Sequence, residues 1–114
     1  MPRRLDVALE DMLTAMARIE ETVRGGDYAS FSADWRKQYI VERALQIVSE
    51  ASRAIPDSLR VQHPEIKWIG VRDIGNVLRH QYASVSAKLI WDVVVEELPK
   101  LREAVEKLRN PNSR

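Results

Sequence analysis

Hydrophobic residues recur every three or four positions along most of this chain, a spacing that places them on one face of an α-helix. The N-terminal segment shows this pattern with hydrophobic side chains at Leu5, Leu9, Met12, Leu13, Met16, Ile19 and Val23. The sequence Gly25-Gly26-Asp27 follows, and glycine readily takes the left-handed backbone conformation in which many helices end. The pattern therefore predicts a helix from about Leu5 to Val23.

Two further helices are predicted in the middle of the chain. The second begins after Ser30 or Ser32, either of which is a suitable N-cap, and ends before Pro56. Residues 55–64 form a connection, and Pro64 suits the first turn of the third helix because the backbone N–H that it lacks would be unpaired there. The third helix carries its hydrophobic side chains at Ile66, Ile69, Ile74, Val77 and Leu78.

The last predicted helix follows a turn at residues 83–86, with Ser86 as its N-cap. The run Val93-Val94-Val95 favours a strand locally, but it lies inside a helical pattern that continues to Leu108. Pro99 is expected to kink this helix because proline removes one backbone hydrogen bond and clashes with the preceding turn. Since no alternating strand pattern is found, the sequence predicts an all-α, up-and-down bundle of four to five helices.

Composition supports one folded domain. The chain has 114 residues, 31% of them charged and 45% hydrophobic, so we expect a single helical domain over residues 1–109 and a frayed tail at 110–114. There is no cysteine, which excludes disulfides and thiolate chemistry. The two histidines, His63 and His80, lack metal-ligand spacing, so we expect neither a metal nor another cofactor.

Charge and hydropathy place few limits on partners. The formal net charge of +1 gives no general attraction to a polyanion, so any binding of nucleic acid needs a local cationic patch. Charged residues interrupt the first twenty positions, which leaves no hydrophobic stretch for a signal peptide or a membrane span. A cytoplasmic location without membrane attachment is the expectation.

The third helix carries the best candidate chemistry. Arg72, Asn76 and His80 are four residues apart, so they form a polar ridge on one face. Histidine transfers protons near neutral pH, and the arginine guanidinium binds phosphate oxygens through a planar fork of donors. Arg79 is a second cation beside His80. Gly75 lies in the interior of this helix, which indicates that a neighbouring element approaches its backbone closely.

These groups fit the cleavage of RNA without a metal. That reaction needs a base for the 2′-hydroxyl, an acid for the leaving 5′-oxygen and cations near the phosphorus. His80 suits either proton transfer, with Arg72 or Arg79 as the electrostatic clamp. A single histidine does not easily fill both roles, so a symmetric homodimer, in which two His80 side chains flank one cleft, would complete the site.

Each of these residues also has a plain structural interpretation. A histidine near a helix end is more often a cap or a surface residue than a catalyst, and Arg72 can simply pair with Asp73. Tyr82 is a typical half-buried aromatic residue at a rim. Trp35 and Tyr39 are more typical of a packing pair than of a platform on which RNA bases stack. On periodicity and composition alone, the structural interpretations are favoured.

The order of short motifs changes this balance, because it resembles the HepT-like toxins of the HEPN superfamily. Residues 47–51, Ile-Val-Ser-Glu-Ala, resemble the Ile-Gly-Glu-Ala of that family, and residues 63–68 resemble its Pro-Glu-Ile-Pro-Trp. The sequence His80-Gln81-Tyr82 is similar to its His-x-Tyr. Residues 91–94 and 98–101 resemble its Trp-x-Ile-Val and Leu-Pro-x-Leu. The resemblance covers nearly the whole chain.

The resemblance implies a dimeric, metal-independent ribonuclease toxin with RNA as its substrate. It also implies a partner, a minimal nucleotidyltransferase antitoxin that attaches AMP to the tyrosine at the place of Tyr82. One position departs from the family pattern Arg-Asn-x-x-x-His-x-Tyr, because Gly75 stands where the arginine is expected. Either Arg72 or Arg79 then supplies the charge, or the chain is a degenerate module that binds nucleotide, RNA or the antitoxin without cleavage.

Overall fold

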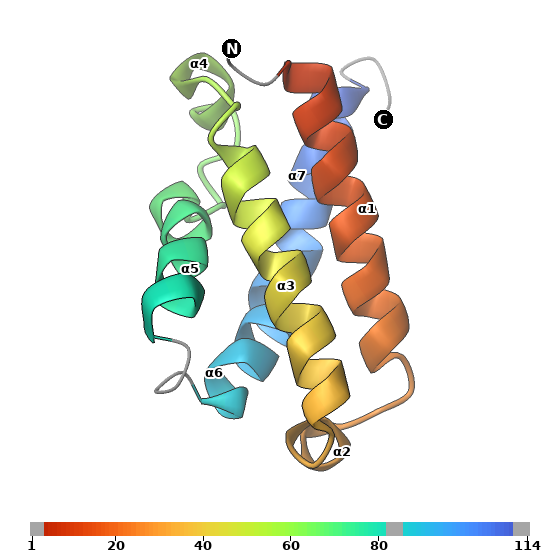
Figure 1. Ribbon diagram of the computed structural model, residues 1–114. Helices are drawn as coiled ribbons and strands as arrows, with labels where there is room; N and C mark the ends of the chain where they lie inside the picture. Colours follow the sequence, from red (N-terminus) through yellow and green to blue (C-terminus); the bar gives the residue numbers. More distant parts are fainter. Residues whose placement is uncertain (1–3, 82–85, 111–114) are drawn as a thin grey trace.

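The computed structural model describes residues 4–81 and 86–110, and every regular element within these ranges is helical. The prediction of the all-α class is confirmed. The helices, shown in Figure 1, are α1 (Leu5–Val23), α2 (Tyr28–Ser32), α3 (Trp35–Ser52), α4 (Asp57–Arg60), α5 (Trp68–Gln81), α6 (Ala87–Asp92), the π-helical segment η2 (Val93–Glu97) and α7 (Leu98–Arg109).

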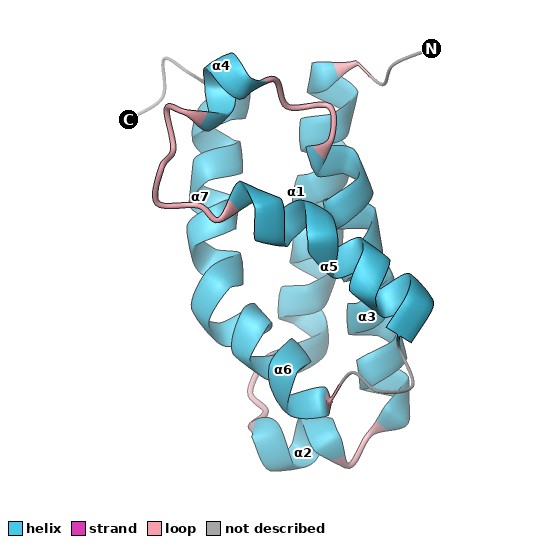
Figure 2. Cartoon of the chain, turned by 90° about the vertical axis from the view of Figure 1, so that its left-hand side faces the viewer, coloured by secondary structure: helices cyan, strands magenta, loops and turns pink. Residues whose placement is uncertain are grey.

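The long helices form an up-and-down bundle in which α1 packs against both α3 and α7. Helix α5 packs on α3, and Figure 2 shows it running obliquely across the bundle. The short helices α2 and α4 lie at opposite ends of the bundle (Figure 1). This arrangement places α5, the helix with the candidate chemistry, on the outside of the bundle rather than at its centre.

The core follows the hydrophobic pattern of the sequence. The side chains of Met12, Met16 and Ile19 on α1 are fully buried, and the largest buried side chain, Phe31, comes from α2. Leu78 connects α5 to this core with only 1% of its surface exposed. Burying a large aliphatic or aromatic side chain contributes about 1.5–3 kcal/mol, so the hydrophobic face of each long helix fixes its orientation.

The start of α3 differs from the prediction. Asp34, not Ser30 or Ser32, is the N-cap of α3, and its carboxylate accepts hydrogen bonds from the backbone N–H groups of Arg36 and Lys37. The two serines lie within the separate helix α2, whose N-cap is Asp27. Aspartate is as good an N-cap as serine, so the pattern alone did not decide between them.

Asp27 and Ser30 form a reciprocal capping box at the start of α2. The Asp27 carboxylate accepts a hydrogen bond from the Ser30 backbone N–H at 2.9 Å, and the Ser30 hydroxyl oxygen accepts one from the Asp27 N–H at 3.0 Å. The bonds from Ser30 lower the pKa of Asp27, because they stabilise the ionised carboxylate. The turn before this box contains Gly25 with φ 74°, as the Gly25-Gly26-Asp27 sequence predicted.

The connection before α5 also differs from the prediction. It contains the short helix α4, and α5 begins at Trp68, so Pro64 lies in a turn and not in the first turn of α5. The Trp68 indole N–H donates to the backbone carbonyls of Arg60 and His63, both at 3.1 Å. These bonds hold the connection against the start of α5, and the helix begins four residues after the proline.

The C-terminal helix is interrupted close to Pro99. Ser86 caps α6 as predicted, with its hydroxyl accepting from the Leu89 N–H at 3.1 Å. The predicted interruption takes the form of the π-helical segment η2, at whose end the Leu98 N–H donates to the Val93 carbonyl. Because Pro99 has no N–H to donate, the widened turn is a favourable way to join α6 to α7.

Helices α1 and α7 are also linked at the surface. Arg109 pairs with Glu10 at 3.0 Å, and Arg102 pairs with Glu20.

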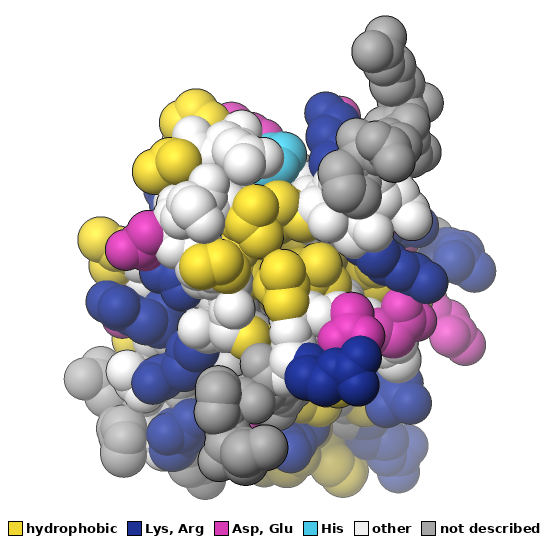
Figure 3. Space-filling view, turned by 90° about the horizontal axis from the view of Figure 1, so that it is seen from above, with side chains coloured by type: hydrophobic (Ala, Val, Ile, Leu, Met, Phe, Trp, Pro, Cys, Tyr) yellow, Lys and Arg dark blue, Asp and Glu magenta, His cyan; other side chains and the backbone are white. Residues whose placement is uncertain are grey.

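The end of the bundle in Figure 3 shows hydrophobic side chains gathered near the middle, with cationic and acidic side chains around them. No helix within residues 4–81 or 86–110 is long and hydrophobic enough to cross a membrane. The predicted tail begins at Asn110, and its residues 111–114 lie outside the described residues.

Candidate functional site

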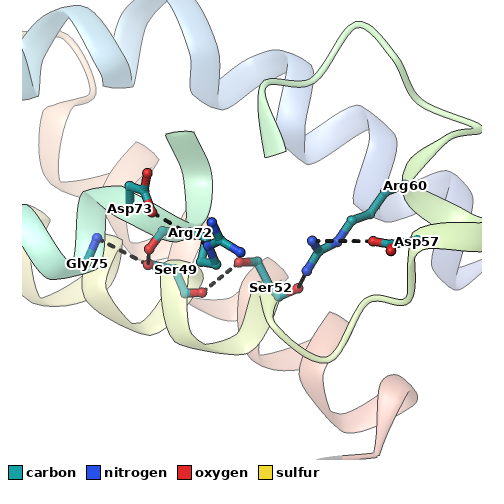
Figure 4. A network of polar contacts seen from close by, with 7 residues as sticks. All are labelled: Ser49, Ser52, Asp57, Arg60, Arg72, Asp73 and Gly75. Atoms are coloured by element: carbon teal, nitrogen blue, oxygen red, sulfur yellow. Dashed lines mark hydrogen bonds and ion pairs between the residues drawn. The ribbon is translucent and has the colours of Figure 1, made fainter. Parts of the chain in front are cut away.

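Helix α5 is held against α3 at Gly75. A Cβ atom at this position would lie 2.8 Å from the Ser49 Cβ, closer than real side chains approach. The Ser49 hydroxyl fills the space instead, accepting a hydrogen bond from the Gly75 N–H at 3.1 Å and donating one to the Arg72 carbonyl at 2.6 Å. Figure 4 shows these bonds joining the two helices. The prediction of a close backbone approach at Gly75 is confirmed.

The same network continues along α3 to the connection before α5. The Ser52 hydroxyl donates to the Ser49 carbonyl at 2.6 Å, and the Arg60 guanidinium donates to the Ser52 carbonyl at 3.2 Å (Figure 4). Arg60 also lies 3.8 Å from the Asp57 carboxylate. The buried residue Ser49 therefore joins α3 to α5 directly, while Ser52 joins α3 to the connection at Arg60.

Two residues of the predicted polar ridge, Arg72 and Asn76, lie on the outer face of α5. Arg72 and Asn76 are exposed, while Leu78 on the opposite side is buried. His80 lies in the last turn of the same helix, one turn beyond Asn76, but its side chain is outside the described residues. Tyr82 also lies outside them. The structure thus shows that the first two ridge residues are exposed. The proposed roles of Arg72, Asn76, His80 and Tyr82 stay predictions.

Arg72 and Arg79 differ in their surroundings. The Arg72 guanidinium lies 3.6 Å from the Asp73 carboxylate, so the structural interpretation of Arg72 as an ion-pair partner has support. Arg79 is exposed and has no ion-pair partner among the described residues. The two arginines are seven positions apart, which places them near one face of the helix and about 10 Å apart along its axis.

Arg79 lines a surface groove between α5 and α3. The groove has a volume of about 370 Å³, and its lining residues are Tyr39, Glu42, Arg43, Gln46, Leu78 and Arg79. Arg43 is exposed, and its guanidinium donates to the Gln46 side-chain oxygen at 3.3 Å. Partial burial raises the pKa of Glu42, because removal from water disfavours the ionised carboxylate. The groove therefore has two cations and one carboxyl with a weakened tendency to ionise.

Trp35 lies on the surface and not in the core. It is 61% exposed, and its ring packs edge-to-face against Tyr39, which is 59% exposed, with centroids 5.4 Å apart. The two residues do form a packing pair, but the pair lies on the surface. Trp68 and Trp91 are half-buried, and Trp91 contacts Phe31 with ring centroids 5.5 Å apart.

His63 lies in the turn before α5, as predicted. Its Nδ1 lies 3.3 Å from the Glu65 carboxylate. Within the described part of the chain, no three histidine, aspartate or glutamate side chains come close enough together to hold a metal ion. The expectation of a metal-independent reaction stays a prediction.

With this geometry in hand, comparison with known proteins gives the family. The sequence model described as ribonuclease HepT-like matches residues 12–108. The chain belongs to the HepT-like ribonuclease family. A relative named as a probable ribonuclease HepT, from Thermococcus cleftensis, is 39% identical over 101 residues, which cover 89% of this chain and 92% of the relative. A candidate RNase of Methanocaldococcus jannaschii is 33% identical over 104 residues, covering 91% and 95%. No solved structure gives a significant match.

The contact between Ser49 and Gly75 joins two positions that differ from the HepT-like motifs. The resemblance described above implies glycine at the place of Ser49, before Glu-Ala, and arginine at the place of Gly75, before asparagine. The two departures from the motifs face each other across α3 and α5. A serine on α3 takes the space that a side chain at position 75 would need, so a larger residue at position 75 requires a smaller one at position 49.

Sequence reasoning found the ridge on α5 but missed the groove beside it. Tyr39 and Arg43 are one helical turn apart on α3, and only the packing of α5 on α3 brings them next to Arg79. Their four-residue spacing is a signal that they share a face. It does not say which other helix borders that face, because that depends on contacts between residues far apart in the sequence.

Proposed function

We propose that this chain is a metal-independent endoribonuclease that acts as the toxin of a toxin–antitoxin pair. The observation that carries the proposal is the exposed Arg72–Asn76 face of α5, which leads to His80 in a segment matched by the HepT-like family. The ribonuclease names of the relatives support the choice of RNA as substrate.

The proposed reaction is a transesterification within the RNA strand. One proton-transfer group removes the proton from a 2′-hydroxyl, the 2′-oxygen attacks the adjacent phosphorus, and the bond to the 5′-oxygen breaks. A second group returns a proton to the leaving oxygen, so that a cyclic phosphate and a free 5′-hydroxyl result. His80 takes one of these roles. Arg72 or Arg79 stabilises the charge that develops on the phosphoryl oxygens, and Asn76 orients the substrate or the histidine.

A homodimer supplies the second proton-transfer group in this proposal. Each protomer contributes one His80, and a twofold axis beside α5 places the two side chains on either side of one RNA strand. The position of α5 on the outside of the bundle supports this arrangement, because the helix is not enclosed by the rest of its own chain (Figure 2).

The proposed partner is a minimal nucleotidyltransferase antitoxin that attaches AMP to Tyr82. A nucleotide phosphate two residues from His80 would occupy the anion site and repel RNA. Co-expression with the neighbouring nucleotidyltransferase should raise the intact mass by units of AMP, and Tyr82→Phe should abolish the increase. An unchanged mass beside an active nucleotidyltransferase would contradict this part of the proposal.

Cleavage itself is tested with purified protein and RNA in the presence of a chelator. General acid–base catalysis contributes roughly 10²- to 10⁴-fold, so His80→Ala should lower the rate by that order. Arg72→Ala and Arg79→Ala, compared with Arg53→Ala at the far end of α3, identify which arginine replaces the one missing at position 75. Equal background cutting by the wild type and His80→Ala would exclude the enzymatic proposal.

One observation favours a second candidate, a degenerate module that binds RNA, nucleotide or the antitoxin without cleavage. The usual family arginine is absent, and the backbone at Gly75 is closed off by Ser49. In this case His80→Ala would leave biological function intact, while disruption of the partner surface would abolish it. A toxic effect in cells that depends on His80 would exclude this candidate.

A further inference from the structure

The outer face of α3 presents aromatic and cationic side chains in a regular row. Trp35, Tyr39 and Arg43 follow one another at four-residue steps, so they share a face and extend about 12 Å along the helix. Both rings are more than half exposed. The Arg36 guanidinium lies over the Trp35 ring, 5.3 Å from its centroid, which adds a further positive charge beside the pair.

This row borders two surface grooves. Tyr39 and Arg43 line the groove shared with Arg79 of α5, and they also line a second groove of about 530 Å³ between α3 and α1. Figure 1 shows α3 lying between α5 and α1, in agreement with these linings. The aromatic row is therefore continuous with the face of α5 that leads to His80.

The charges along the grooves are mostly positive. Arg18, Arg43 and Arg79 line them, against the carboxyls of Asp11 and Glu42. Glu42 is the carboxyl residue among those that line the groove with Arg79, and its partial burial raises its pKa. With Arg36 beside Trp35, this face has four arginines against two carboxyls, an excess larger than the formal net charge of +1 for the whole chain.

We infer that this face is an RNA-binding subsite, in which Trp35 and Tyr39 stack on bases of a single-stranded segment while Arg43 and Arg79 contact its phosphates. The inference rests on the proposed ribonuclease function and extends it from the reacting phosphate to the flanking nucleotides. Aromatic side chains in a cationic groove are the usual means of holding single-stranded nucleic acid without strong sequence preference. We call this face the α3 subsite.

The same residue types occur in protein interfaces, but the charge distribution favours RNA. A twofold contact between two copies of this face would bring together two surfaces that each have more arginines than carboxyls. An RNA strand instead supplies a phosphate for each arginine, and release of its counterions favours binding. Charge complementarity therefore selects RNA over a second copy as the occupant.

The test measures binding separately from cleavage. In a His80→Ala background, a short fluorescein-labelled single-stranded RNA is titrated at low salt and its anisotropy recorded. Stacking on one aromatic side chain contributes about 1–3 kcal/mol, so Trp35→Ala and Tyr39→Ala should each weaken binding by roughly 5- to 150-fold. Trp35→Phe should retain most of the affinity, because a flat ring remains. Arg43→Ala should reduce the salt dependence by about 0.7 in the slope of log K against log salt.

Two substitutions outside the face are the controls. Val61→Ala removes an exposed hydrophobic side chain at the end of α4, and Arg53→Ala removes an exposed cation at the other end of α3. Both should leave the affinity unchanged within about twofold. Sedimentation or light scattering of every variant reports whether the oligomeric state has changed.

The outcomes separate this inference from the proposed function. Aromatic variants that bind RNA as tightly as the parent overturn the subsite, even if the wild-type protein cleaves RNA. Conversely, a wild-type protein that binds through Trp35 and Tyr39 but never cuts RNA upholds the subsite and overturns the nuclease. Dissociation of a dimer by Trp35→Ala, with RNA affinity unchanged in the monomer, would assign the face to a second copy and overturn the inference.

Discussion

Helix α3 has two halves with opposite constraints. Near its C-terminal end, Ser49 is buried against Gly75 so closely that position 75 has no room for a side chain. Near its N-terminal end, Trp35 and Tyr39 are large side chains with more than half of their surface exposed. One helix thus contains both a contact that determines where α5 lies and a surface on which little constrains residue size.

The comparison shows that residues of one helix meet different constraints, depending on whether another helix packs against them. In the buried half, the Ser49 hydroxyl makes two hydrogen bonds to the backbone of α5. Removal of this one oxygen atom would therefore affect the packing of both helices. The exposed half has no such dependence, so its aromatic and cationic residues are available to bind a ligand. Substitutions in the two halves should therefore have opposite profiles, one in stability and the other in RNA binding.

The largest effect is expected from restoring the family arginine. Gly75→Arg places a long side chain against Ser49 and should abolish cooperative unfolding, as followed by circular dichroism during heating. The double variant Ser49→Gly with Gly75→Arg should recover a cooperative transition, because the Ser49 side chain that causes the clash is removed. If Gly75→Arg alone melts like the wild type, then α5 moves freely on α3 and the contrast between the halves of α3 is wrong.

A smaller effect is expected from Gly75→Ala. Overpacking typically costs about 1–3 kcal/mol, which should exceed the gain of about 1 kcal/mol from replacing glycine inside a helix. Gly70→Ala is the matched control on α5, because a Cβ there would approach only the Lys67 Cβ, at 3.8 Å. Urea denaturation should show a loss of stability for position 75 and none for position 70. In a Ser49→Gly background, the cost of Gly75→Ala should disappear.

The exposed half should contribute little to stability. Trp35→Ala should change the free energy of unfolding by about 0.5 kcal/mol or less, as surface substitutions usually do. Leu78→Ala, at a buried position on α5, should cost about 2–5 kcal/mol by comparison. Chemical denaturation of both variants makes the comparison. A large loss for Trp35→Ala would mean that the pair with Tyr39 serves the fold and not a ligand.

The smallest effect concerns Glu42, between the two halves. Because burial raises its pKa in the folded protein, the ionised carboxylate is less favourable in the folded than in the unfolded state. This unfavourable contribution is absent below the unfolded pKa of about 4.3 and develops as the pH rises through the folded pKa. Glu42→Gln should therefore raise the melting temperature at neutral pH but not at about pH 3.5.

Exposed Glu21 provides the control for this pH dependence. Glu21→Gln should not reproduce the pH-dependent gain in melting temperature. A Glu42→Gln variant whose melting temperature shifts equally at both pH values would show that burial of the carboxyl is not the cause. The same variant should also bind RNA more tightly at neutral pH, since it removes a negative charge from the groove next to Arg79.

Several features were predictable because local sequence decides them. The bounds of α1 agree with the hydrophobic pattern from Leu5 to Val23, and Ser86 caps its helix as expected. Gly75 was correctly interpreted as a place of close approach, since glycine is unfavourable inside a helix without such a reason. The predicted N-cap of α3 was wrong, because Asp34 and two nearby serines suit the position equally well and the cap is Asp34.

The remaining features depended on contacts between distant residues. The sequence favoured a packing pair of Trp35 and Tyr39, but it did not show that this pair lies on the surface. Pro64 was placed in α5, but the hydrogen bonds of the Trp68 indole keep it in a turn. Neither result follows from a local pattern, because each depends on which surfaces the other helices cover.

The sequence by itself determined the helical class, the first helix and the ridge of Arg72, Asn76 and His80, because spacing along one helix fixes which residues share a face. Only the tertiary structure decided that Ser49 takes the space at Gly75 and that Arg79 shares a groove with Tyr39 and Arg43. Those relations arise when two helices pack, and the fit of their surfaces depends on residues that are 26 to 40 positions apart in the sequence.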